Sequence, residues 1–146
     1  MSLGCALPVP AQGDLGAKPR TRVLLVSAID EDRLQLAQIL GSVLWQVDRV
    51  STCHEAEQEI RRTRPPIVIT DVGLLDGDWT CVHQVTKSVK PQAHLIILSN
   101  RSDSRLWFEA RQSGAHDVLV KPLQDAEVQS MLTAAREDWA ARTLRF

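Results

Sequence analysis

Three polar residues of different chemistry each follow a short, mostly apolar run. Asp71, Ser99 and Lys121 stand directly after such runs, and each run is typical of a buried strand in a parallel sheet. Because the carboxyl ends of these strands lie at one edge of an open α/β sheet, we expect the carboxylate, the hydroxyl and the ammonium to meet there. Together these three groups suit acyl-phosphate chemistry.

The rest of the chain alternates strands and helices that would position those residues. Strands are predicted at 23–26, 45–50, 67–70, 95–98 and 118–120. Helices are predicted over 34–44, 53–64, 78–87, 103–112 and 125–141. The apolar positions of the first helix are Leu34, Ala37, Leu40 and Leu44. Thr52 and Glu55 have the spacing of a capping box, and Gly114 suits a helix end. The order predicts an α/β fold of the (βα)5 type.

The length suits one folded domain with terminal extensions. Residues 1–20 contain several prolines and glycines without periodicity, which predicts a disordered tail. The folded domain is predicted to span 21–141, and residues 142–146 would form a tail or the start of a linker.

The charge balance narrows the class of partner. Seventeen basic and 18 acidic residues give a formal charge of −1, which argues against extended binding to nucleic acid or to a membrane surface. The chain also lacks an apolar run long enough to span a bilayer. We therefore expect a soluble, cytoplasmic protein without direct nucleic-acid or membrane contacts.

The cysteines Cys5, Cys53 and Cys81 are odd in number and have no C-x-x-C spacing. This pattern predicts neither a disulfide framework nor a zinc site. We expect all three to be small apolar side chains in a reducing compartment.

Residues 22 to about 140 resemble the receiver domain of bacterial two-component response regulators. Residues 70–78 resemble the phosphoacceptor aspartate and its loop, 98–100 resemble the switch hydroxyl, and 119–122 resemble the Lys-Pro pair of the family. The resemblance implies a doubly wound, flavodoxin-like parallel sheet of five strands in the order 2-1-3-4-5.

The resemblance also implies the chemistry. Asp71 would accept a phosphoryl group from a histidine kinase or a phosphotransfer protein, Lys121 would pair with the phosphate, and Ser99 would act as the switch hydroxyl. Mg2+ would be held by Asp71 and the backbone carbonyl of Gly73. Enzymatic activity would be limited to autophosphorylation and autodephosphorylation of the aspartate, so a metabolic enzyme is not expected.

Two departures mark an atypical member. The family's acidic metal-binding pair falls on Ser27 and Ala28, which carry no carboxylate. The acids at 30–32 follow within a turn, and we expect them to cap the first helix and leave Mg2+ only weakly bound. The second departure is Val118, where the family usually has a mobile aromatic residue, so the readout of phosphorylation should be muted.

The resemblance places Trp107 on the face formed by the fourth helix, fifth strand and fifth helix, and we count Val118 with it as a candidate interface residue. Family members use this face for homodimerisation or docking, although a tryptophan ring can equally cover the edge of the core. Two functions stay open. The domain is either a phosphorylated receiver that controls protein interaction or a pseudo-receiver that docks or dimerises without phosphorylation. Because the chain has neither G-x-G-x-x-G nor a P-loop, a nucleotide-binding enzyme is disfavoured.

Overall fold

The computed structural model describes residues 20–41, 44–101, 103–115 and 117–143. The predicted tail at 1–20, apart from Arg20, and Cys5 within it lie outside the described residues. Residues 144–146 also lie outside them, whereas Arg142 and Thr143 continue the last helix.

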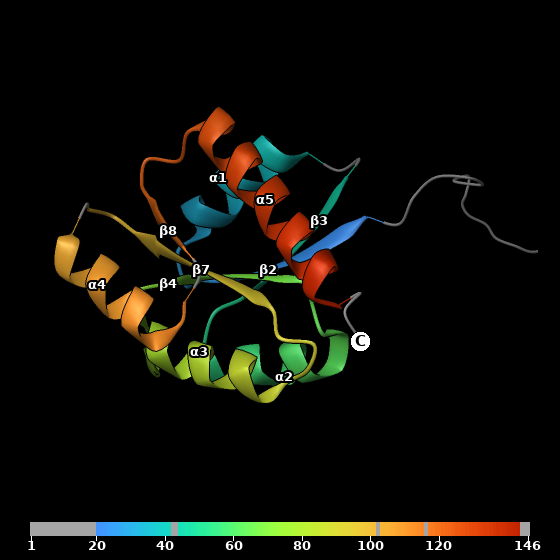
Figure 1. Ribbon diagram of the computed structural model, residues 1–146. Helices are drawn as coiled ribbons and strands as arrows, with labels where there is room; N and C mark the ends of the chain where they lie inside the picture. Colours follow the sequence, from blue (N-terminus) through green and yellow to red (C-terminus); the bar gives the residue numbers. More distant parts are fainter. Residues whose placement is uncertain (1–19, 42–43, 102, 116, 144–146) are drawn as a thin grey trace, which may run out of the picture.

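A five-stranded parallel sheet forms the centre of the molecule (Figure 1). Its strands are β2 (Thr21–Val26), β3 (Trp45–Val50), β4 (Ile67–Asp71), β7 (His94–Ser99) and β8 (Asp117–Val120). They lie in the order β3-β2-β4-β7-β8, which confirms the predicted order 2-1-3-4-5. A separate antiparallel hairpin, β5 (Gly73–Leu74) and β6 (Gly77–Asp78), follows β4 directly.

Helices cover both faces of the sheet (Figure 1). One face carries α1 (Asp30–Leu40) and α5 (Asp125–Thr143), and the other carries α2 (Cys53–Thr63), α3 (Trp79–Ser88) and α4 (Ser104–Ser113). Successive strand residues enter opposite cores: Leu24 and Val26 pack with α2, α3 and α4, whereas Val23 and Leu25 pack with α1 and α5. Because both faces are covered, the central strands are apolar almost throughout.

The predicted apolar face of the first helix is only partly right: of Leu34, Ala37, Leu40 and Leu44, Leu40 alone is buried. Leu34 and Leu44 are exposed, and the helix ends at Leu40, before Gly41 with a φ of 66°. The buried stripe consists of Asp32, Leu36 and Leu40 at intervals of four residues. Leu34, two positions from Leu36, therefore lies almost on the opposite side of the helix.

Capping side chains and a glycine fix the ends of several helices. The Thr52 hydroxyl accepts a hydrogen bond from the Glu55 amide at 3.1 Å, as the capping box predicts. The Glu55 carboxylate in turn accepts from the Ser51 amide, one residue before the helix cap. Gly114 ends α4 in the left-handed region, with a φ of 91°. None of the helices in the described ranges is long and apolar enough to cross a membrane.

Candidate functional site

Asp71 and Lys121 meet at the carboxyl edge of the sheet. Asp71 is the last residue of β4, and Lys121 follows β8 directly. The Lys121 ammonium lies 3.6 Å from Asp71 Oδ1, and both side chains are largely buried. The Lys121 amide donates to the Ser99 carbonyl at 2.7 Å, so the strand that separates the two residues also positions the lysine backbone.

Asp32 is a third charged residue of this site, and the expectation that it merely caps a helix is wrong. Its Oδ2 accepts from Lys121 Nζ at 3.0 Å, and the residue is only 3% exposed. Asp30, by contrast, is exposed and pairs with Arg49 at 3.2 Å. Asp32 shares the buried stripe of α1 with Leu36 and Leu40, so the helix directs its carboxylate inward. The four-residue spacing of Asp32, Leu36 and Leu40 can be read in the sequence, but the register of α1 decides that this stripe is the buried one.

Ser27 holds the Asp32 carboxylate in place. The fully buried Ser27 hydroxyl donates to Asp32 Oδ2 at 2.9 Å and accepts from the Ile29 amide at 3.1 Å. Its carbonyl accepts from Arg49 Nη1 at 3.2 Å. Ala28 is exposed. Receiver domains usually carry an acid at the position of Ser27. Here the Ser27 hydroxyl takes that place and orients Asp32 from the following helix.

The surroundings of Asp71 disfavour its ionised form. Burial raises the pKa of this carboxyl, the Lys121 ammonium lowers it, and the Asp32 carboxylate raises it again, so that the pKa lies above its ordinary value. The lysine therefore compensates only part of the cost of placing two carboxylates at this edge.

The Ser99 hydroxyl is bound within its own loop. Its Oγ donates to the Arg101 carbonyl at 2.8 Å and accepts from the Arg101 amide at 3.2 Å. In the described part of the chain, no hydrogen bond joins this hydroxyl to Asp71 or Lys121. A pocket of about 360 Å³ borders the loop. Its lining residues are Val72, Trp79, Ser99, Asn100, Arg101, Asp103, Leu106 and Glu109.

The Mg2+ site that the resemblance implies fits these residues poorly. Mg2+ prefers an octahedral set of oxygen ligands, usually including carboxylates. Asp71 and Asp32 supply carboxylates here, but Asp32 Oδ2 already accepts from Ser27 and Lys121, whose ammonium lies against both acids. Across the described ranges, no three acidic, histidine or cysteine side chains are arranged to hold a metal ion. Gly73, whose carbonyl was the other predicted ligand, is exposed in β5.

The predicted interface residues differ in burial. Val118 is 4% exposed and belongs to the core beneath α2, α3 and α4, so its side chain is covered by this chain itself. Strand β8 turns this side chain inward, as the alternation along a strand requires. Trp107 is half-buried and packs against the same core, whereas its neighbour Phe108 is 64% exposed.

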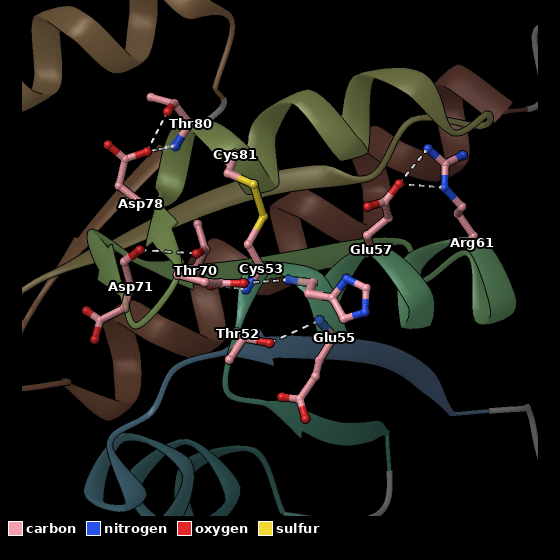
Figure 2. The surroundings of a disulfide bond; sticks show 12 residues. Thr52, Cys53, Glu55, Glu57, Arg61, Thr70, Asp71, Asp78, Thr80 and Cys81 are labelled. Atoms are coloured by element: carbon pink, nitrogen blue, oxygen red, sulfur yellow. Dashed lines mark hydrogen bonds and ion pairs between the residues drawn. A yellow bond between two sulfur atoms is a disulfide. The ribbon is translucent and has the colours of Figure 1, made fainter.

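A disulfide joins Cys53 and Cys81, contrary to the expectation of free cysteines. Cys53 is the first residue of α2, Cys81 lies in the first turn of α3, and the Cα atoms are 6.4 Å apart. Figure 2 shows the bond between the two helices. Both helices begin at the carboxyl edge of the sheet, so their first turns are close in space although distant in sequence. An odd number of cysteines does not reveal this contact.

The Asp76 carboxylate links the hairpin after Asp71 to the start of α2. It accepts from the Cys53 amide at 2.7 Å and from the His54 amide at 3.0 Å, and these bonds lower its pKa. Asp76 lies in the turn between β5 and β6. The hairpin after Asp71 is therefore hydrogen-bonded to the start of α2.

Comparisons with known proteins agree with this geometry. The model of the response regulator receiver domain family matches residues 19–133. The chemotaxis protein CheY of Thermotoga maritima is 27% identical, and the match covers 76% of this chain and 93% of CheY. The transcriptional regulatory protein YesN of Bacillus subtilis is 28% identical, with coverage of 70% of this chain but only 30% of YesN.

Solved structures show the same fold. The signal receiver domain of an HD domain-containing protein from Pseudomonas fluorescens has a TM-score of 0.80 at 22% identity, and the match covers 89% of this chain and 96% of that one. The receiver domain of a sensor histidine kinase from Pseudomonas aeruginosa has a TM-score of 0.72 at 21% identity, covering 82% and 99%. That structure contains a magnesium ion in its active-site cleft.

Proposed function

The chain belongs to the response regulator receiver domain family, and on that premise we propose that Asp71 accepts a phosphoryl group. The donor is the phosphohistidine of a histidine kinase or of a phosphotransfer protein. The observation that carries this proposal is the placement of Asp71 at the end of β4 with the Lys121 ammonium 3.6 Å away. We place the reaction in the cytoplasm, together with the phosphodonor.

The transfer needs a nucleophilic oxygen and a nearby positive charge. A carboxylate oxygen of Asp71 attacks phosphorus, the phosphorus–nitrogen bond of the donor breaks, and the imidazole leaves. The acyl phosphate adds negative charge beside Asp32. Lys121, a compact cation that already contacts both carboxylates, offsets this charge. Asp32 thus positions Lys121, and Ser27 positions Asp32 through its hydroxyl.

Ser99 responds to the new phosphoryl group. Its hydroxyl leaves the Arg101 carbonyl and donates to a phosphoryl oxygen, which changes the loop that leads into α4. The pocket beside this loop gives the Arg101 and Asp103 segments room to move. Because Val118 is a buried, β-branched side chain, the change at its position is small.

The output is a protein interaction. Receiver domains interact with histidine kinases and phosphotransfer proteins, and some of them dimerise. We place the regulated contact, including a homodimer, on the face of α4, β8 and α5; Phe108 of α4 is an exposed aromatic residue. Trp107, packed at the core edge, would support α4 from beneath.

Phosphorylation of the purified chain tests the proposal. The chain is incubated with acetyl phosphate, and separately with a phosphohistidine donor protein, with and without Mg2+, and its intact mass is measured. We expect the wild type to gain one phosphoryl group, Asp71→Asn to gain none, and Asp32→Asn to react more slowly. Asp30→Asn is the matched control, because Asp30 is an exposed acid of the same helix turn and should react like the wild type. A folded chain that takes phosphate from neither donor would instead be a docking or dimerisation module that works without phosphorylation.

A further inference from the structure

The two cysteines of the disulfide differ in their exposure to solvent. Cys53 is 3% exposed and belongs to the core beneath α2, α3 and α4. Cys81 is exposed on the first turn of α3 (Figure 2). Cys81 is therefore the side from which a reagent in solution would approach the bond, because Cys53 is covered.

The disulfide closes a ring that contains the phosphoacceptor candidate. The chain between Cys53 and Cys81 comprises α2, β4 with Asp71, and the hairpin β5–β6. Figure 2 shows Asp71 and Asp78 in the surroundings of the bond. A change in the mobility of this segment on cleavage of the bond would therefore extend to Val72, the residue next to Asp71.

The same segment is also held by hydrogen bonds. Asp76 accepts from the first two amides of α2, and the Trp79 amide donates to the Val72 carbonyl at 3.0 Å. These contacts, together with the buried side chains of α2 and α3, do not depend on the disulfide. Because these contacts remain after cleavage of the bond, the fold should persist. The loss of the covalent link should loosen only the hairpin and the first turn of α3.

We propose that Cys53 and Cys81 form a reversible redox modification site, whose substrate is a thiol reductant and whose state controls the segment around Asp71. A thiolate of the reductant attacks the Cys81 sulfur, a mixed disulfide forms, and Cys53 leaves as a thiolate that takes up a proton. A second reductant thiolate then attacks the reductant sulfur of the mixed disulfide and releases Cys81. The protein disulfide is reduced to two thiols, and the two reductant thiols are oxidised to one disulfide.

The segment freed by reduction borders the switch loop. Val72 and Trp79 line the pocket beside α4 together with Ser99 and Arg101. Loosening of the hairpin therefore changes a pocket that the Ser99 loop also lines. The influence on phosphorylation rests on the proposed function of Asp71, whereas the thiol chemistry does not.

A redox titration of the full chain tests the site itself. The chain carries Cys5→Ser to prevent thiol–disulfide exchange with this third cysteine. It is equilibrated in mixtures of reduced and oxidised dithiothreitol and alkylated, and its intact mass is then measured. We expect a reversible two-electron transition in which Cys53 and Cys81 become labelled together without denaturant. Amide exchange should show local opening of residues 72–81 on reduction, while the strands of the sheet still exchange only through global unfolding. Cys81→Ser should reproduce this loss permanently, and Thr80→Ser, which retains a hydroxyl at the neighbouring position, should not.

Some outcomes would overturn the proposal. A bond that is reduced only after denaturation would be a structural link, and cysteines that stay free in oxidised dithiothreitol would form no bond at all. If Asp71 is phosphorylated at the same rate in both redox states, the site does not control that residue. If neither state is phosphorylated but the titration is reversible and the hairpin loosens, the redox site stands and the proposed function fails.

Discussion

The two sides of Asp71 are held in different ways. On the side of α1 and β8, Asp32, Lys121 and Ser27 form a compact charged cluster without any covalent link. On the side of α2 and α3, a disulfide joins the first turns of the two helices, and the Asp76 carboxylate attaches the hairpin to α2. The first arrangement responds to pH and to any change of charge at Asp71. The second responds to reduction. Asp71 thus lies between a cluster that is sensitive to pH and charge and a segment that is sensitive to reduction.

Reduction of the disulfide should have the largest effect on stability. The bond joins residues 28 positions apart, and closing a loop of that length stabilises a fold by about 3–4 kcal/mol through the entropy of the unfolded chain. Urea unfolding of Cys81→Ser should show a loss of this size relative to the oxidised chain. A change in the free energy of unfolding below about 1 kcal/mol would mean that the hydrogen bonds of Asp76 and Trp79, without the disulfide, are enough to hold the hairpin against α2 and α3.

Lys121→Met should have the next largest effect, because it leaves two buried carboxylates without their cation. We expect a loss of roughly 3 kcal/mol in the free energy of unfolding near pH 7, which becomes smaller in acid as Asp71, whose pKa is raised, is protonated. Adding Asp71→Asn in the same chain should restore part of it. Lys87→Met, at an exposed position of α3, is the matched control. An equal loss in the control variant would show that the charged cluster contributes nothing specific.

Asp71→Asn should stabilise the protein, by less than Lys121→Met destabilises it. Burial raises the pKa of Asp71 in the folded state, so its ionisation favours the unfolded chain. The stabilisation by the protonated Asp71 carboxyl is complete below the pKa of this group in the unfolded chain. It is lost as the pH rises through the higher pKa of the group in the folded chain. Thermal unfolding measured from pH 3 to 8 should therefore show a gain for the variant that grows with pH. A destabilised variant at pH 7 would mean that Lys121 overcompensates the burial of the carboxylate.

Added Mg2+ should have the smallest effect. Because the ammonium of Lys121 lies against both carboxylates, titration followed by calorimetry or tryptophan fluorescence should show no saturation in the low millimolar range. Ser27→Asp with Ala28→Asp should restore binding if the rest of the edge can accept a cation. Saturation by the unmodified chain would show that Mg2+ displaces Lys121 from Asp32.

The sheet and two site residues could be predicted from the sequence because each depends on local patterns. Buried parallel strands are apolar runs, and the residue after each run lies at a known edge, which located Asp71 and Lys121. Asp32 was missed because an acid in the first turn of a helix has an ordinary explanation as a cap. The burial stripe that it shares with Leu36 and Leu40 depends on the register of α1. The Cys53–Cys81 bond is a contact between separate helices, so no local pattern indicates it.

The backbone of Ser99 has a further consequence for the speed and energy of the response. Ser99 pairs with Val120 in the ladder between β7 and β8, and its carbonyl accepts from the Lys121 amide. Rotation about χ1 can therefore redirect the hydroxyl while the ladder stays intact. The rotation gives up two hydrogen bonds to Arg101, each worth about 1 kcal/mol, and gains one to a charged acceptor, worth roughly 1.5–3 kcal/mol. In the phosphorylated chain the two rotamers of Ser99 are thus nearly balanced in free energy. A rapid rotation of the Ser99 side chain should precede any slower movement of α4.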